Sequence, residues 1–162
     1  MIVTEAVRAR GHPNVRATHR STLEVTRDGY LTPRGDCIIG VSADKAAADL
    51  SPSFKDLLRS GGRLIIAVVA GGVYDIIRAR GSPHLTMGDT RSIVVRRSRY
   101  VDGRTVAVGS DKAAADLRRD LVDLLRRGRE LSLVLVAYEG EQAREAEREV
   151  YKKLRDLTYL GP

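Results

Sequence analysis

The side chains best suited to chemistry in this chain gather in one short segment, residues 11–20. It combines two imidazoles, a side-chain amide and two guanidinium groups, and the carboxylate of Asp36 lies just before a later stretch with strand-like character. A carboxylate beside an imidazole raises the pKa of the histidine toward neutral pH, which suits either proton transfer or anion binding. The sequence therefore predicts a polar ligand site formed by His12, Asn14, Arg16, His19 and Asp36.

Cys37 adds a thiol to these residue types. Together with His12, His19 and Asp36 it offers ligand types that zinc accepts, but the spacing matches no zinc pattern and there is no paired cysteine motif. A thiolate nucleophile would need an adjacent imidazole. Because Cys37 begins an apolar stretch, a buried and unreactive thiol is the more typical outcome. We therefore expect no metal and no cofactor.

A second group of candidates is basic. The formal net charge is +7, and seven arginines lie between Arg78 and Arg104 against only Asp89 and Asp102. Arginine forms paired contacts with phosphate, so this stretch favours an anionic partner. The predicted nucleic-acid contacts are Arg78, Arg80, Arg96, Arg97 and Arg99.

Two observations weaken the nucleic-acid interpretation. Only 4% of the residues are aromatic, which leaves few surfaces on which bases can stack. Side chains alternate between the two faces of a strand, so these arginines would be divided between two surfaces. The solvated surface of a heat-adapted protein is the alternative interpretation of the charge.

These candidates lie on a chain that repeats itself. The heptapeptide Asp44–Leu50 recurs letter for letter as Asp111–Leu117, and Arg8–Gly11 recurs as Arg78–Gly81. The pattern predicts one domain made of two copies of a unit of roughly seventy residues, 1–72 and 73–139, followed by an added helix in 140–162. Residues shared by the copies are expected to serve the fold, and the diverged loop 11–20 to carry function.

Each copy predicts the order strand, strand, strand, helix, strand. Alternating or apolar stretches place strands at 2–10, 21–27, 37–41 and 63–70, and at 73–80, 91–99, 104–109 and 131–138. In each copy the second and third strands are expected to form a hairpin. Asp44 and Asp111 are expected to be helix N-caps, since aspartate accepts the free amides of a first turn. Residues 44–60 are then interrupted at Pro52, whereas 111–127 form one unbroken helix.

Residues 141–156 have helical spacing of apolar side chains and predict an amphipathic helix, expected to cap an open sheet edge. The fold class that follows is α+β and β-rich. The duplicated units form a sandwich-like or barrel-like domain that carries a C-terminal helix.

The segment Gly11-His12-Pro13-Asn14-Val15-Arg16-Ala17-Thr18-His19, with the later stretches 34–40 and 42–46, resembles an archaeal family catalogued as domain of unknown function three-seven-one. Residues 95–98, 104–105 and 111–114 resemble it as well. The resemblance spans nearly the whole chain. It implies an archaeal cytosolic protein with a mainly β, sandwich-like fold, and it implies no activity, cofactor or catalytic residue.

Composition narrows the classes of protein to which this chain can belong. No apolar run reaches the ~20 residues that a membrane helix needs. The first ten residues carry Glu5 and no apolar signal core, so a cytoplasmic protein without a membrane partner is expected. We expect a binding module for an anionic ligand, either RNA or a nucleotide-like molecule. The sequence leaves two alternatives open: an enzyme with a histidine and aspartate site in the loop 11–20, and a structural assembly subunit, with a homo-oligomer compatible with each.

Overall fold

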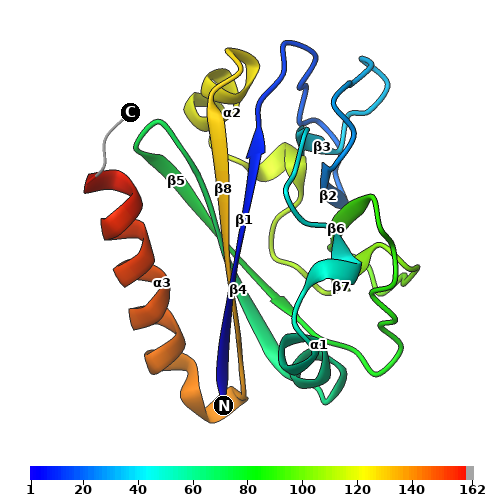
Figure 1. The fold of residues 1–162 in the computed structure, drawn as a ribbon, viewed down its shortest axis with the longest axis vertical. Coiled ribbons are helices and arrows are strands. Elements are labelled where there is room, and N and C mark those ends of the chain that lie inside the picture. The colour runs from blue at the N-terminus through cyan, green and yellow to red at the C-terminus, as the bar shows by residue number, and fades with distance from the viewer. Residues whose placement is uncertain (160–162) are drawn as a thin grey trace.

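The computed structural model describes residues 1–159 and contains two four-stranded β-sheets that pack face to face (Figure 1). Sheet A has the order β1-β8-β4-β5, and sheet B the order β3-β2-β6-β7. The strands of sheet A are β1 (Ile2–Arg10), β8 (Glu130–Tyr138), β4 (Arg63–Ala70) and β5 (Val73–Arg80). Those of sheet B are β3 (Ile38–Gly40), β2 (Thr22–Thr26), β6 (Ser92–Arg96) and β7 (Thr105–Ala107).

The sheets meet at both edges through single bridges, Arg10 with Val41 and Arg80 with Val108. These bridges do not close a barrel within residues 1–159, so the domain is a β-rich sandwich. Its core lies between the sheets, where alternate residues of each strand point inward. Val7, Leu64 and Leu133 of sheet A and Leu23 and Ile93 of sheet B are each at most 2% exposed.

The order of elements in residues 2–70 recurs in residues 73–138. Each half contains three strands, a short 3-10 turn, a helix and a fourth strand. The 3-10 turns are η1 (Ala47–Asp49) and η2 (Ala114–Asp116), and the helices are α1 (Pro52–Arg59) and α2 (Arg119–Arg126). The two helices lie at opposite ends of the sandwich (Figure 1).

Equivalent strands of the two halves pair at the centre of each sheet. In sheet A, β4 runs antiparallel to β8, with Ile65 opposite Val136 and Val69 opposite Ser132. In sheet B, β2 runs antiparallel to β6. In both pairs, replacing each residue by its equivalent in the other half gives another pair of the same register. A pseudo-twofold axis therefore passes between the central strands. The outer strands of sheet A cross between halves, since β1 pairs with β8 and β5 pairs with β4.

The heptapeptide shared by the two halves does not begin a helix, so the N-cap prediction for Asp44 and Asp111 is wrong. The carboxylate of Asp44 accepts the backbone N–H of Arg8 on β1 at 2.9 Å, and Asp111 accepts that of Arg78 on β5 at 2.9 Å. These contacts turn each aspartate toward the strand that lies earlier in the chain, and the short turns begin only at Ala47 and Ala114. The cap of α1 is instead Ser51, whose Oγ accepts the N–H of Phe54 at 3.2 Å.

The unbroken helix predicted for 111–127 is also wrong. The chain forms η2, becomes extended at Leu117, and begins α2 only at Arg119. No proline causes this interruption. Asp116 closes the short turn by accepting the backbone N–H of Ala113 at 2.8 Å, and Asp49 does the same for Ala46 in the first half. A side chain that satisfies the turn amides locally competes with helix continuation.

The lysine of the heptapeptide neutralises a buried carboxylate. Lys45 Nζ lies 2.9 Å from Oε1 of Glu5, whose side chain is 9% exposed and whose Oε2 accepts the N–H of Ser51 at 2.6 Å. Lys112 and the 7%-exposed Asp75 form the equivalent pair at 2.5 Å. Burial opposes the charge on Glu5, but Lys45 and the Ser51 amide outweigh it and hold the pKa of Glu5 below its ordinary value.

The hairpins predicted for the second and third strands are wrong. β3 pairs parallel to β2, with Glu24 opposite Ile38, and β7 pairs parallel to β6, with Val94 opposite Thr105. A parallel pair needs a connection long enough to return the chain to the start of the first strand. The loop 27–37 provides that length, and the antiparallel position beside β2 is taken by β6.

The helix predicted for 141–156 is present as α3 (Ala143–Tyr159), after a short turn η3 (Gly140–Gln142). It covers the outer face of sheet A and not an edge, which corrects the expected role (Figure 1). Ala146, Val150 and Leu154 pack against apolar side chains of β4 and β8. The helix lies there because the outward-facing residues of these central strands are apolar. None of the helices within residues 1–159 is long and apolar enough to cross a membrane.

Replacing Lys45 by methionine should destabilise the protein by about 3 kcal/mol, because Glu5 would stay buried without its counter-charge. Urea unfolding measures the loss. The control Lys152→Met, on the exposed surface of α3, should change stability by less than about 0.5 kcal/mol.

Acidification provides a second test of the same pair. Folding lowers the pKa of Glu5. The ionised Glu5 therefore contributes fully to the free energy of unfolding at pH values above its pKa in the unfolded chain, and this contribution is lost as the pH falls through its pKa in the folded protein. The unmodified protein should therefore lose more stability on acidification than Lys45→Met. An equal loss in both proteins would contradict the role assigned to the pair.

Candidate functional site

The candidate loop Gly11–Arg20 is held in place by α2, a helix of the other half. A Cβ on Gly11 would lie 1.9 Å from the carbonyl oxygen of Leu125, so only glycine fits this contact. Arg126 Nε donates to the carbonyl of Val15 at 2.9 Å, and Arg119 Nη1 donates to that of Ala17 at 3.1 Å. The loop is therefore a fixed part of the fold.

Both histidines of this loop accept backbone amides through Nδ1. His12 accepts the N–H of Asn14 at 3.0 Å, and His19 accepts those of Ser21 at 3.2 Å and Thr22 at 3.0 Å. An acceptor at Nδ1 requires that atom to be unprotonated. Each imidazole thus stabilises a turn of its own loop.

The second half makes the same turns with other side chains. Ser82, the equivalent of His12, accepts the N–H of His84 at 3.2 Å. Asp89, the equivalent of His19, accepts those of Arg91 at 3.0 Å and Ser92 at 2.7 Å. The difference in residue type that singled out the first-half loop therefore does not change the hydrogen-bonding role at these positions.

The remaining predicted residues contact the loop mainly through the backbone. The carbonyl of Asp36 accepts the N–H groups of Thr18 at 3.0 Å and His19 at 3.2 Å. Asn14 Nδ2 donates to the carbonyl of Leu31 at 2.7 Å, and Arg16 donates to that of Pro33 at 3.4 Å. The structure thus brings 11–20 against 31–36. Within residues 1–159, no ion pair or hydrogen bond joins the Asp36 carboxylate to either imidazole, so the acid–base site stays a prediction without a contact to support it.

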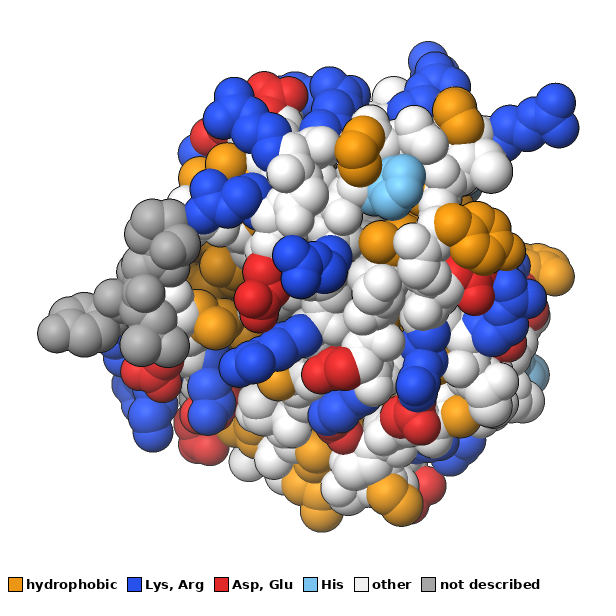
Figure 2. All heavy atoms as spheres, turned by 45° about the horizontal axis from the view of Figure 1, so that its top comes forward, with side chains coloured by type: hydrophobic (Ala, Val, Ile, Leu, Met, Phe, Trp, Pro, Cys, Tyr) orange, Lys and Arg blue, Asp and Glu red, His pale blue; other side chains and the backbone are white. Residues whose placement is uncertain are grey.

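Three of the five predicted nucleic-acid arginines are bound to carboxylates. Arg96 is 8% exposed, donates to Thr105 Oγ1 at 2.9 Å and to Asp102 at 3.0 Å, and lies under the ring of Tyr100. Arg97 pairs with Asp116 at 3.3 Å, and Arg78 with Glu147 at 2.5 Å. On the face shown in Figure 2, basic side chains are separated by acidic and uncharged ones and form no continuous patch.

The other two, Arg80 and Arg99, line one hollow of about 250 Å³, here named the arginine hollow. It lies at the corner of the sandwich where the end of β5 bridges to Val108 after β7. Within residues 1–159, neither guanidinium has an ion pair or hydrogen bond to a carboxylate. The lining residues include no acid: Arg80, Gly81, Ser82, Pro83, His84, Arg99, Val108 and Gly109.

Gly109 shapes this hollow. Its φ is +59°, and a Cβ there would lie 3.0 Å from Nη2 of Arg80, so the missing side chain lets the guanidinium lie against the backbone. The equivalents of Arg99 and Gly109 in the first half are Gly29 and Ser42. The difference between Arg99 and Gly29 is visible in the sequence alone, whereas the shared hollow of Arg80 and Arg99 is visible only in the fold.

Cys37 is unsuited to nucleophilic catalysis. Burial and, to a smaller extent, the nearby carboxylate of Glu24, which accepts the S–H at 3.5 Å, together raise the pKa of its thiol to about 12. Within residues 1–159, no group of three or more histidine, cysteine or acidic side chains is arranged to hold a metal ion.

The backbone role of His19 can be tested by two substitutions. His19→Ala leaves the amides of Ser21 and Thr22 without their acceptor and should cost about 1–3 kcal/mol in urea unfolding. His19→Asp copies Asp89 and should recover most of that loss. Equal stability of the alanine and aspartate variants would contradict the turn-forming role.

The reactivity of Cys37 gives another test. Because a pKa of about 12 leaves almost no thiolate at pH 8, iodoacetamide should modify the folded protein far more slowly than the protein unfolded in urea. Mass spectrometry at successive times measures both rates. Similar rates in the two states would show that the thiol is exposed and activated.

The chain is similar to known proteins over most of its length. Residues 7–138 match the model of a family described as a domain of unknown function, DUF371. An uncharacterised protein of the archaeon Methanocaldococcus jannaschii is 39% identical over 130 residues, which cover 80% of this chain and 96% of that protein. The family match ends at Tyr138, the last residue of β8, so α3 lies beyond it. The chain therefore belongs to the DUF371 family.

Proposed function

We propose that the protein binds a small phosphate-bearing ligand in the arginine hollow. The observation that carries the proposal is that Arg80 and Arg99 line one concavity without a carboxylate partner within residues 1–159. Guanidinium groups form short, charge-assisted hydrogen bonds with phosphate oxygens, often in pairs. Two of them facing one concavity without a counter-charge favour an anion there.

Neighbouring groups support a nucleotide-like ligand. Ser82 and His84 also line the hollow and supply a hydroxyl and an imidazole for hydrogen bonds to phosphate or sugar oxygens. Tyr100 follows Arg99 in the chain and is 62% exposed, and the face of its ring that does not cover Arg96 is a candidate for stacking on a base.

An extended RNA ligand has less support from the same surface. Arg78 and Arg97 are engaged in ion pairs, and Arg96 is buried, so three of the expected phosphate contacts are unavailable without breaking other interactions. A hollow of about 250 Å³ fits a small molecule better than a strand of nucleic acid. Binding of RNA is therefore one outcome of the test below.

We also infer that the two halves are copies of one unit that diverged at this corner. The repeated heptapeptides, the repeated order of elements and the symmetric registers support this inference. The arginine-rich composition, with only Asn14 and Gln142 as side-chain amides, supports heat adaptation as part of the same proposal.

The proposal predicts that Arg80→Gln and Arg99→Gln each weaken binding of a nucleoside triphosphate or of inorganic pyrophosphate at least about tenfold, since each removes a charged hydrogen-bond donor. Calorimetric titration measures the affinity. The matched control is Arg10→Gln. Arg10 is the first-half equivalent of Arg80, but the first half has Gly29 at the position of Arg99 and so lacks the second arginine.

Titration of a single-stranded RNA at several salt concentrations separates the two kinds of ligand. A small ligand held by two arginines should show a shallow dependence on salt, whereas RNA gripped by many phosphate contacts should show a steep one. Absence of binding by both kinds of ligand at low salt would remove the proposal. So would equal affinity in Arg80→Gln, Arg99→Gln and Arg10→Gln.

A further inference from the structure

A second hollow lies between β2 and β6 on the outer face of sheet B. Its volume is about 190 Å³, and we name it the axial hollow because it lies beside the pseudo-twofold axis. None of its lining residues belongs to the arginine hollow. They are Glu24, Thr26, Asp28, Ile38, Asp89, Arg91, Ser92 and Arg104.

The axial hollow arises from one difference between the two halves. Thr22 lies opposite Arg96 on one side of the axis, and Thr26 lies opposite Ser92 on the other. The axis relates Arg96 to Thr26, because these residues are equivalent in the two halves. The long side chain of Arg96 fills its side of the face, whereas the short side chain of Thr26 leaves the axial hollow on the other.

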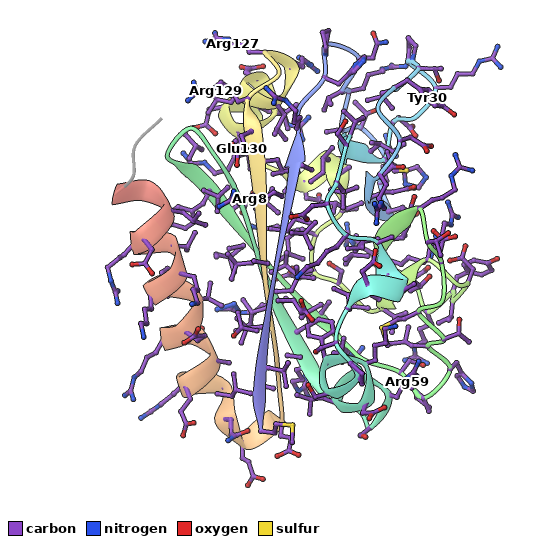
Figure 3. All side chains as sticks on the ribbon, in the orientation of Figure 1. Arg8, Tyr30, Arg59, Arg127, Arg129 and Glu130 are labelled. Atoms are coloured by element: carbon purple, nitrogen blue, oxygen red, sulfur yellow. The ribbon has the colours of Figure 1, made fainter. Side chains whose placement is uncertain are left out.

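The side of the face that Arg96 fills shows which kind of group binds well there. The guanidinium of Arg96 donates to the carboxylate of Asp102 at 3.0 Å and to the hydroxyl of Thr105 at 2.9 Å, and it lies 4.9 Å from the centre of the Tyr100 ring. Tyr30 is the equivalent of Tyr100, is 65% exposed and lies on the loop after β2 (Figure 3). The axial hollow likewise offers hydroxyls, from Thr26 and Ser92, and carboxylates.

Glu24 provides an unused acceptor in the axial hollow. Its side chain is only 9% exposed. Oε1 accepts the S–H of Cys37 at 3.5 Å and lies 3.7 Å from the guanidinium of Arg104. Oε2 has no hydrogen-bond partner within residues 1–159. This oxygen keeps contact with solvent, because no side-chain oxygen of the described residues is both fully buried and unpartnered. It can therefore accept a hydrogen bond from a ligand in the hollow, and the charge of the carboxylate strengthens such a bond.

The charges around the axial hollow leave one negative charge in excess. Asp28 pairs with Arg91 at 2.6 Å, and Arg104 is bound to Asp102 at 2.9 Å as well as lying near Glu24. The hollow is lined by three carboxylates, those of Glu24, Asp28 and Asp89, and by the two guanidinium groups of Arg91 and Arg104. A ligand with a single positive charge balances this set.

We propose that the axial hollow binds the guanidinium or primary ammonium group of an organic cation, with Glu24 as its counter-charge. The bound group takes the place that Arg96 occupies on the other side of the axis. The cation is either a free small molecule or an arginine or lysine side chain of a peptide, since both present the same group. This proposal is independent of anion binding in the arginine hollow, because the two sites share no residue.

Titration with methylguanidine, agmatine and butylamine, followed by calorimetry and by NMR chemical shifts, tests the proposal. Saturable binding is expected, and Glu24→Gln should weaken it at least about tenfold, because the neutral amide keeps the shape and removes the charge. The control Asp123→Asn changes an exposed carboxylate on α2 and should leave the affinity within about twofold.

Thr26→Arg provides a second variant that does not depend on the stability of Glu24→Gln. It places a tethered guanidinium in the axial hollow, as Arg96 does on the other side, and should abolish binding of the free cations. Thermal melting establishes that each variant is folded. A short peptide with a central arginine distinguishes the sources: affinity equal to that of agmatine assigns a peptide side chain, and weaker affinity assigns a free small molecule.

Two results would overturn the proposal. One is the absence of saturable binding for all three cations and the peptide up to about 10 mM, a concentration at which even a contact worth only a few kcal/mol is detected. The other is unchanged affinity in a folded Glu24→Gln or a folded Thr26→Arg variant.

Discussion

Two antiparallel strand pairs, β4 with β8 and β2 with β6, join each half of the molecule to its equivalent across the pseudo-twofold axis. Because these pairs lie at the centre of their sheets, they fix where every other strand can pair. Near the axis, each residue lies beside the position equivalent to its own. Glu24 is opposite its equivalent Val94, so a single difference between the halves becomes an asymmetry within one sheet face.

The same symmetry makes each half a support for the other. Gly81 packs against the carbonyl of Leu58 in α1, as Gly11 packs against that of Leu125 in α2. Arg59 of α1 donates to the carbonyls of Leu85 and Thr86 in the second-half loop (Figure 3). The loops at both corners are thus held by the helix of the opposite half. A site built on them has a fixed geometry, which reduces the entropy lost when a ligand binds.

The local patterns of the sequence predict the strands well, because alternation and apolar runs reflect the two faces of a sheet directly. The C-terminal helix follows from its spacing for the same reason. The parallel placement of β3 was not predictable, since it depends on β6 occupying the other side of β2. Nor was the contact of Asp44 with Arg8, because a favourable helix cap in the sequence was outweighed by a strand amide 36 positions away.

For the candidate sites too, some features can be predicted from the sequence and others only from the fold. Arg80 and Arg99 stand out in the sequence as basic residues, but only the fold shows that they share a concavity. Arg96 has the same residue type and is buried beneath its own loop. Glu24 sits at an outward position of a strand, which normally indicates solvent. Its burial comes from side chains that are distant in sequence, so no local pattern reveals it.

Within residues 1–159, strand β1 pairs along its length with β8 alone, with Ile2 opposite Tyr138. During synthesis, β1 leaves the ribosome long before β8 exists, so sheet A cannot close until residue 138 has been translated. Contacts so distant in sequence slow folding, because chain closure must be achieved before they stabilise anything. Until then, the apolar side chains of β1 and β4 lack the strand that covers their edges, and exposed apolar strands of this kind favour aggregation.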